Sequence, residues 1–199
     1  MASGLSESEV KTSPKTEESA EAAPPDTMAP GGHAYWRLSL ALATVWLAID
    51  HLTKWWAIEA LKPAWWDLEV LPPGMDPTRP TIPVIPGLLQ FVYAENTGAA
   101  FSFMTGRTTA LGFISLAASV ALYLFWKTLP AREVWGRVAV ALIFSGAVGN
   151  LIDRFFRGYV VDFIDAYYGS YHWPTFNIAD SCICVGAAIL VVRFLQKKI

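Results

Sequence analysis

The stretch GNLIDRFFRGYVVDFIDAYYGSYHWPTFNIAD, residues 149–180, holds acidic side chains in or beside segments that are otherwise apolar enough to lie in a membrane. Its acids are Asp153, Asp162, Asp165 and Asp180, and Asp50 occupies a similar place in an earlier apolar segment. An ionisable group is costly to keep in a bilayer, so these acids indicate a functional site unless a simple partner explains them. The rest of the sequence indicates where they lie relative to one another.

The composition is that of a membrane protein with a polar tail. Of the 199 residues, 54% are hydrophobic and 16% are charged, whereas an ordinary soluble domain has about 25% charged residues. Residues 1–33 carry six acids, two lysines and almost no large apolar side chains. We therefore predict a disordered tail there and one membrane domain over residues 34–199. The tail lacks the pattern of a cleaved secretory signal, and no basic patch indicates nucleic-acid binding.

Four apolar segments are long enough, or nearly so, to cross a bilayer as helices. They cover residues 36–58, 108–129, 133–152 and 178–195. In the proline-rich connection after the first segment, residues 88–94 (LLQFVYA) have the β-branched and aromatic content of a strand. The sequence thus predicts an all-α polytopic membrane protein with four transmembrane helices. Cys182 and Cys184 are interpreted as small packing residues of the last helix.

Basic residues orient the predicted bundle, because they gather between the second and third segments and at the C-terminus: Lys127, Arg132, Arg137, Arg193, Lys197 and Lys198. The positive-inside rule makes both groups cytoplasmic. Both termini are then cytoplasmic, and the connections 62–97 and 153–177 lie outside. The polar residues predicted to meet at the outer surface of the membrane are Asp50, Asn96, Asn150, Asp153, Arg154, Asp162 and Asp180.

Two of these residues suit general acid–base chemistry. Carboxylates in close contact share one proton, because both cannot ionise cheaply. Asp162 has apolar neighbours that should raise its pKa, whereas Asp180 lies at a helix start where Asn177 is a possible N-cap and the dipole favours a charged acid. Such a pair can activate water and polarise a carbonyl, as aspartic proteases do. Which acid is the base stays open, because a coupled pair titrates as a unit.

Other acids have simpler interpretations. Asp50 has Lys54 four residues later on the same helix, in the favourable order for an ion pair. Asp153 stands beside Arg154, and the two are predicted to tie a helix end to neighbouring loops. Asp165 is predicted to be a solvated loop acid.

Four alternatives stay open at this point. A metal held by Asp162, Asp165 and His172 is conceivable, although the histidines show no metal-binding spacing. Asn150 could be a helix C-cap instead of a site residue. The protein could also be a transporter, which would need acids across the whole membrane, or a scaffold whose acids only lock helices together.

Five motifs, in this order, resemble those of the signal peptidase II family: DHLTK from Asp50, NTGAAFS from Asn96, GNLIDR from Gly149, GYVVDFI from Gly158 and FNIADS from Phe176. The resemblance covers roughly residues 36–196. It implies an aspartic endopeptidase of the bacterial plasma (inner) membrane, with four transmembrane helices and an extracytoplasmic β-cradle to which residues 88–94 contribute. Members of the family cut prolipoproteins just before a diacylglyceryl-modified cysteine and are targets of globomycin.

Carried over by motif, the resemblance makes Asp162 and Asp180 the catalytic pair. The residues implied to hold the substrate or shape the site are Asn96, Gly98, Asn150, Arg154 and Asn177. Those implied to be structural are Asp50, Lys54 and Asp153. The expected partners are a diacylated prolipoprotein and membrane lipid, with no cofactor, no metal and a monomeric enzyme. The acidic tail and the long proline-rich stretch from Pro63 to Pro86 depart from the family pattern.

Overall fold

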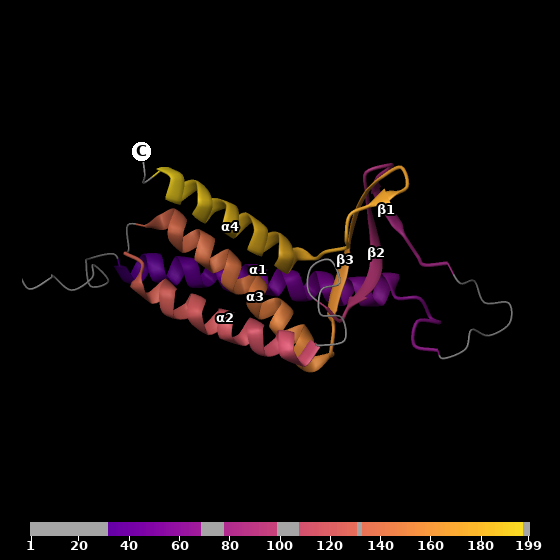
Figure 1. Ribbon diagram of the computed structural model, residues 1–199, viewed down its shortest axis with the longest axis horizontal. Coiled ribbons are helices and arrows are strands. Elements are labelled where there is room, and N and C mark those ends of the chain that lie inside the picture. The colour runs from indigo at the N-terminus through magenta and orange to yellow at the C-terminus, as the bar shows by residue number, and fades with distance from the viewer. Residues whose placement is uncertain (1–31, 69–77, 99–107, 131–132, 197–199) are drawn as a thin grey trace, which may run out of the picture.

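The structure, a computed structural model, describes residues 32–68, 78–98, 108–130 and 133–196, with side chains from Tyr35 onward. Its helices form a bundle and are α1 (Gly32–Leu61), α2 (Thr108–Thr128), α3 (Val134–Phe156) and α4 (Ile178–Gln196). A small sheet stands across one end of this bundle (Figure 1). Because α1 has 30 residues, it reaches past the other helices and contacts two strands of the sheet.

The sheet is antiparallel throughout, in the order β1-β2-β3-β4. Its strands are β1 (Ile82–Ile85), β2 (Leu89–Asn96), β3 (Val160–Tyr168) and β4 (Tyr171–His172). The first two precede α2 and the last two follow α3, so pairing of β2 with β3 joins two distant parts of the chain. One face packs on the end of α1, where Tyr93, Val161 and Phe163 form a buried cluster with Ala57 and Leu61.

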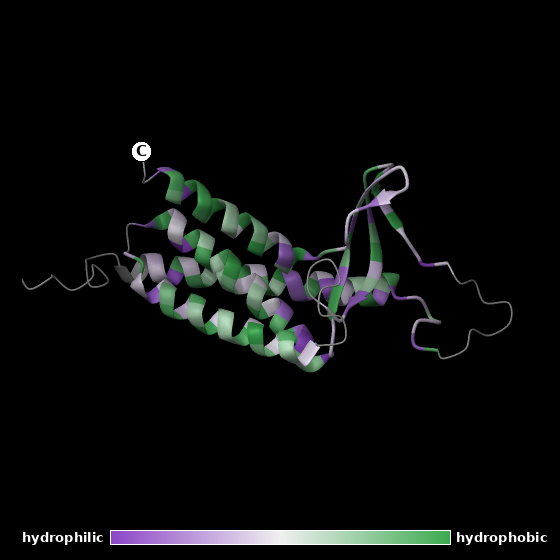
Figure 2. Ribbon diagram, in the orientation of Figure 1, coloured by the Kyte–Doolittle hydropathy of each residue, from purple (hydrophilic) through white to green (hydrophobic). Residues whose placement is uncertain are grey.

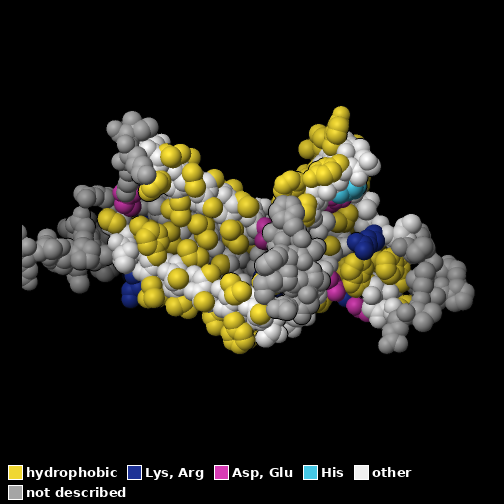
Figure 3. Space-filling model, in the orientation of Figure 1, with side chains coloured by type: hydrophobic (Ala, Val, Ile, Leu, Met, Phe, Trp, Pro, Cys, Tyr) yellow, Lys and Arg dark blue, Asp and Glu magenta, His cyan; other side chains and the backbone are white. Residues whose placement is uncertain are grey.

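The outward faces of the helices are apolar. Large hydrophobic side chains such as Phe113, Leu124 and Val192 are exposed, and hydrophobic groups cover the visible side of the bundle (Figure 3). Hydrophilic residues instead collect where the helices meet the sheet (Figure 2). Exposed apolar surface of this extent marks contact with lipid, and α2, α3 and α4 are long and apolar enough to cross a membrane.

The central helix is α3, which contacts each of the other three. At the end of the bundle away from the sheet, Arg137 of α3 is buried and its Nε donates to the carbonyl oxygen of Pro130 at 3.1 Å. Arg193 of α4 donates to Glu133, just before α3, at 3.0 Å. These two arginines tie α2 and α4 to the start of α3.

The predicted helices match the observed ones to within four residues at every end. The all-α description is incomplete, because β3 and β4 run through the connection 153–177 that was predicted as an external loop. The strand predicted at 88–94 is confirmed as β2, with β1 beside it. Residues 1–31 of the predicted tail and 69–77 of the proline-rich stretch lie outside the described residues.

The approach of α4 to α3 depends on Gly146. A Cβ atom at this position would overlap the carbonyl oxygen of Ala179, in the first turn of α4, and would lie 2.8 Å from a side-chain carbon of Ile183. Backbone cannot move aside without shifting the helix. The small residue therefore fixes where α4 begins relative to α3.

We expect Gly146→Ala to lower the thermal-unfolding midpoint of the detergent-solubilised protein by several degrees, because overpacking of this kind costs roughly 1–3 kcal/mol. Gly112→Ala is the matched control: Gly112 is also a buried helical glycine, but a Cβ there meets its nearest atom at an ordinary 3.9 Å. Equal midpoints for the two variants would contradict the close approach.

Candidate active site

Asp162 is presented by the middle of the sheet. It lies in β3 opposite Ala94 of β2, and its side chain is buried. Asn96, at the end of β2, donates from Nδ2 to Asp162 Oδ2 at 3.0 Å. The amide of Asn177 donates to the other oxygen, Oδ1, at 2.8 Å. Two asparagines from different connections thus hold one carboxylate.

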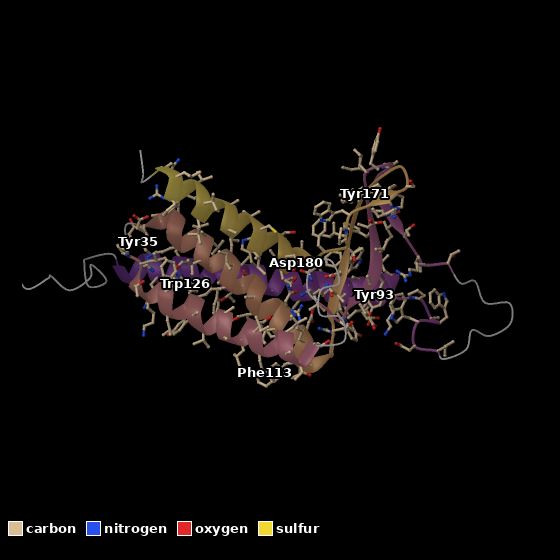
Figure 4. The ribbon with its side chains drawn as sticks, viewed as in Figure 1. Tyr35, Tyr93, Phe113, Trp126, Tyr171 and Asp180 are labelled. Carbon is tan, nitrogen blue, oxygen red and sulfur yellow. The ribbon has the colours of Figure 1, made fainter. Side chains whose placement is uncertain are left out.

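Asp180 is presented by the start of α4, at the helix end that faces the sheet (Figure 4). Its backbone N–H donates to Asn177 Oδ1 at 3.0 Å, and the backbone N–H of Asn177 donates to Asp180 Oδ2 at 3.2 Å. This reciprocal arrangement is a capping box, which satisfies two free N–H groups at the helix start. Asn150 of α3 donates to the remaining oxygen, Oδ1, at 2.8 Å. Since Asn177 also binds Asp162, one side chain connects the two acids.

Behind the two acids lies a fully buried ammonium group, that of Lys54. Its Nζ lies 2.8 Å from Asp50 and 2.9 Å from Asp153, and it donates to Asn150 Oδ1 at 3.0 Å. The three donors of the ammonium group therefore have three acceptors. Asp153 also pairs with Arg157, just after α3, and its Oδ2 accepts the backbone N–H of Val161 in β3 at 3.4 Å.

Asp50 connects this cluster to α4, because its Oδ1 accepts the backbone N–H of Ala179 at 2.9 Å. The approach requires a glycine at position 149, where a Cβ atom would lie 2.5 Å from Asp50 Oδ2. Arg154 extends the network in the other direction. Its guanidinium donates to the carbonyl oxygen of Gly98 at 3.0 Å, while Gly98 N–H donates to Asn96 Oδ1 at 3.0 Å.

Both Asp162 and Asp180 line a cavity of about 870 Å³ between the sheet and α4, large enough for a drug-sized ligand. Most of its wall is apolar. The lining comes from the end of β2 and the residues after it, from α3 and β3, from the segment before α4 and from the first turns of α4. Four of the five residues predicted to hold the substrate or shape the site line the cavity. The fifth, Asn177, is fully buried. Sequence reasoning did not single out the aromatic wall residues Trp173 and Phe176, although Phe176 begins the FNIADS motif and Trp173 lies three residues before it.

Burial raises the pKa of Asp162 to about 7, and the nearby charge of Asp180 acts in the same direction. Hydrogen bonds from Asn96 and Asn177 and the charge of Lys54 oppose this shift only in part. Near neutral pH the pair therefore retains a proton on Asp162 in a large share of molecules. One protonated and one ionised carboxyl can act as acid and base towards the same substrate.

Asp165 is not part of this site, and its prediction as a solvated loop acid is wrong. It is buried and lies in β3, where Gln90 and His172 bind its carboxylate. The metal alternative also finds no support in the described part of the chain, which brings no three His, Cys, Asp or Glu side chains together as a metal site. Asn150 is likewise no helix C-cap, since α3 continues to Phe156.

Comparisons with known proteins give one consistent result. A family model described as signal peptidase (SPase) II matches residues 42–196. A lipoprotein signal peptidase of Syntrophotalea carbinolica is 38% identical over 162 residues, which are 80% of this chain and 91% of that protein. A lipoprotein signal peptidase of Geobacter sulfurreducens is 47% identical over 121 residues, 59% of this chain and 76% of that protein. A solved bacterial membrane enzyme has a TM-score of 0.65 and 31% identity, covering 81% of this chain and 89% of its own.

We expect Lys54→Met to destabilise the protein strongly, because it leaves the buried carboxylates of Asp50 and Asp153 without their cation. Breaking a buried ion pair on one side costs roughly 3–5 kcal/mol, which thermal unfolding in detergent would detect. Lys127→Met is the control, since Lys127 is exposed. Changing both acids to Asn in the Lys54→Met background should recover part of the loss. A Lys54→Met protein as stable as the wild type would contradict the account.

We expect the wild type to lose stability relative to Asp162→Asn as the pH rises from about 4 through 7. The pKa of Asp162 is about 7 in the folded protein and about 3.9 in an unfolded chain. The folded state therefore binds this proton more tightly, and ionisation above pH 7 works against folding by up to roughly 4 kcal/mol. Unfolding midpoints of both proteins between pH 4 and 8 test this, with Asp67→Asn as an exposed-acid control. A pH-independent difference would contradict it.

Proposed function

The chain belongs to the signal peptidase II family, and on this basis we propose that it is a membrane aspartic endopeptidase that removes signal peptides from prolipoproteins. The proposed substrate carries diacylglycerol on a cysteine, and the scissile bond lies just before that residue. Lipoprotein signal peptidases are the curated relatives that the chain resembles over most of its length. No cofactor is required by the proposed chemistry.

The observation that carries the proposal is the joint placement of Asp162 and Asp180. Asn177 donates to Asp162 at 2.8 Å and caps the helix together with Asp180. Both carboxyls face one cavity whose wall is mostly apolar. A peptide bond in this cavity would meet two carboxyls that come from a sheet and from a helix start, with a shared asparagine setting their spacing.

In the proposed reaction, a water molecule lies between the two carboxyls. The ionised carboxylate takes a proton from the water as its oxygen attacks the scissile carbonyl carbon. The protonated carboxyl, which the raised pKa of Asp162 favours for this residue, donates to the developing oxyanion. When the carbon–nitrogen bond breaks, the leaving amine takes up a proton from one carboxyl, while the other carboxyl takes a proton back from a hydroxyl of the tetrahedral intermediate as its carbonyl re-forms. The products are a carboxylic acid and a free amine, and the pair ends with one proton as it began.

The proposed setting is the outer leaflet of the bacterial plasma membrane. The basic residues Lys127, Arg137 and Arg193 lie at the end of the bundle away from the sheet, which supports a cytoplasmic position for that end. We take α1 as a fourth span, because its charged Asp50 and Lys54 are buried and paired inside the bundle while Leu38, Val45 and Leu52 are exposed. Both termini are then cytoplasmic, and the enzyme is proposed to act as a monomer.

The lipid of the substrate is proposed to reach the site along α4. Ile183, Cys184 and Val185 continue the cavity wall from Asp180 towards the apolar outer face of that helix. A diacylglyceryl group held in the outer leaflet would thereby bring the adjacent peptide bond to the two acids. Positioning of this kind supplies a large part of the rate enhancement in many enzymes.

We expect Asp162→Asn and Asp180→Asn each to lower the cleavage rate of a diacylated prolipoprotein by about a thousandfold or more, because each removes one half of the acid–base pair. Purified protein in detergent or liposomes, assayed for release of the signal peptide with and without globomycin, gives the measurement. Full activity in either variant would refute the proposed mechanism.

Thermal stability measured on the same samples separates this function from the alternatives. A scaffold whose acids only lock helices would unfold more readily in both variants, with no cleavage to lose. A transporter would show proton or cation flux in liposomes without peptide release. Asp67→Asn, which changes an exposed acid before β1, should match the wild type in every assay.

A further inference from the structure

A second buried carboxylate of β3, that of Asp165, takes no part in the proposed chemistry. Only 4% of the residue is exposed. Gln90 of the paired strand β2 donates to Asp165 Oδ2 at 2.7 Å. A buried carboxylate needs such partners to offset its desolvation. Its second side-chain partner connects Asp165 to the cavity wall.

That partner is His172, in β4. Its Nδ1 lies 3.0 Å and 2.9 Å from the two carboxylate oxygens of Asp165. An ionised carboxylate can only accept, so Nδ1 carries the hydrogen. The imidazole also stacks on Tyr167, with ring centroids 5.2 Å apart and an interplanar angle of 10°. Although half of the His172 side chain is exposed, its ring is held on one edge and one face.

His172 directly precedes the segment of residues 173–176, which forms part of the cavity wall. From Trp173 to Phe176 the chain runs antiparallel beside β3 and lines the cavity. Trp173 N–H donates to Ala166 at 2.8 Å, and Phe176 N–H donates to Ile164 at 3.1 Å. Between them, Pro174 has no N–H to give. The backbone ladder therefore has a gap in the middle of the wall.

Side-chain bonds to β3 carboxylates hold both ends of this segment. At the end next to the catalytic pair, Asn177 donates to Asp162 at 2.8 Å. At the other end, His172 binds Asp165. The first bond keeps the two acids together and does not involve His172, so the wall can loosen at its far end without disturbing the pair.

We propose that His172 and Asp165 are positioning residues that fix the wall from Trp173 to Phe176 and thereby set how tightly the substrate is held. The proposal rests on the peptidase function inferred above. It assigns the pair to substrate binding and not to the acid–base step, because neither side chain lines the cavity. Loosening the wall should therefore raise KM and leave kcat nearly unchanged.

The kinetic test replaces His172 with Leu, which keeps the bulk but removes the hydrogen bond. We expect KM for a diacylated prolipoprotein to rise roughly three- to tenfold and kcat to stay within about twofold. His172→Asn should restore most of the wild-type KM, because its side-chain amide nitrogen can replace Nδ1. Tyr171→Leu, an exposed change in the same short strand, is the control. A fall in kcat with unchanged KM would overturn the proposal.

A double-variant cycle tests whether His172 acts through Asp165. In an Asp165→Leu background, His172→Leu should raise KM no further, since the partner is already gone. Additive effects of the two changes would overturn the proposed pairing.

Hydrogen exchange measured by mass spectrometry, without substrate, tests the wall independently of activity. In His172→Leu the Trp173 amide should exchange faster, while the Phe176 amide, held nearer to Asn177, should keep its protection. This readout stands even if the protein does not cleave prolipoproteins, so failure of the proposed function and failure of this inference are distinguishable. Unchanged exchange at Trp173 would overturn the inference.

Discussion

A single ammonium group that has no contact with water sets the frame of this protein. Lys54 is fully buried, and leaving such a charge unpaired inside a bundle would cost several kcal/mol. Its three acceptors are Asp50 on its own helix and Asp153 and Asn150 on α3. The folded chain must therefore place α1 and α3 in one register. Asp50 then accepts Ala179 N–H, which fixes the start of α4 as well.

The two proposed catalytic acids differ in their hydrogen-bond partners and in how deeply they are buried. Asp180 stands at a helix start, where a capping box with Asn177 and a bond from Asn150 bind its carboxylate. Asp162 is carried by a strand and is more completely buried, which raises its pKa to about 7. Asn96, Asn150 and Asn177 each orient a carboxyl group and, by the same hydrogen bond, join two elements of the fold. Site geometry and fold stability are consequently hard to separate in this region.

Much of this arrangement could be predicted from the sequence, because hydropathy places the helices and loop charge places their ends. That reasoning brought Asp162 and Asp180 to one surface, and the structure places them in one cavity. It failed for β3, whose acids interrupt the apolar pattern of a strand. It also failed for Asp165, whose burial depends on Gln90, a residue 75 positions away that only strand pairing brings near. Choice of partner among several nearby charges, such as Arg157 over Arg154 for Asp153, is decided by side-chain geometry that spacing alone does not reveal.

The balance of charge in the site gives a reason for the state that the proposed mechanism needs. Its cations and acids interact as one group, comprising Lys54, Arg154, Arg157, Asp50, Asp153, Asp162 and Asp180. With all four acids ionised, the three cations leave one negative charge uncompensated in a poorly solvated place. One proton removes that excess, and the buried Asp162 is the acid that burial and its neighbour favour for it. The cluster is therefore neutral when Asp162 and Asp180 together hold one proton. The network that stabilises the fold thus also favours the protonation state in which one of these acids can donate a proton and the other can accept one.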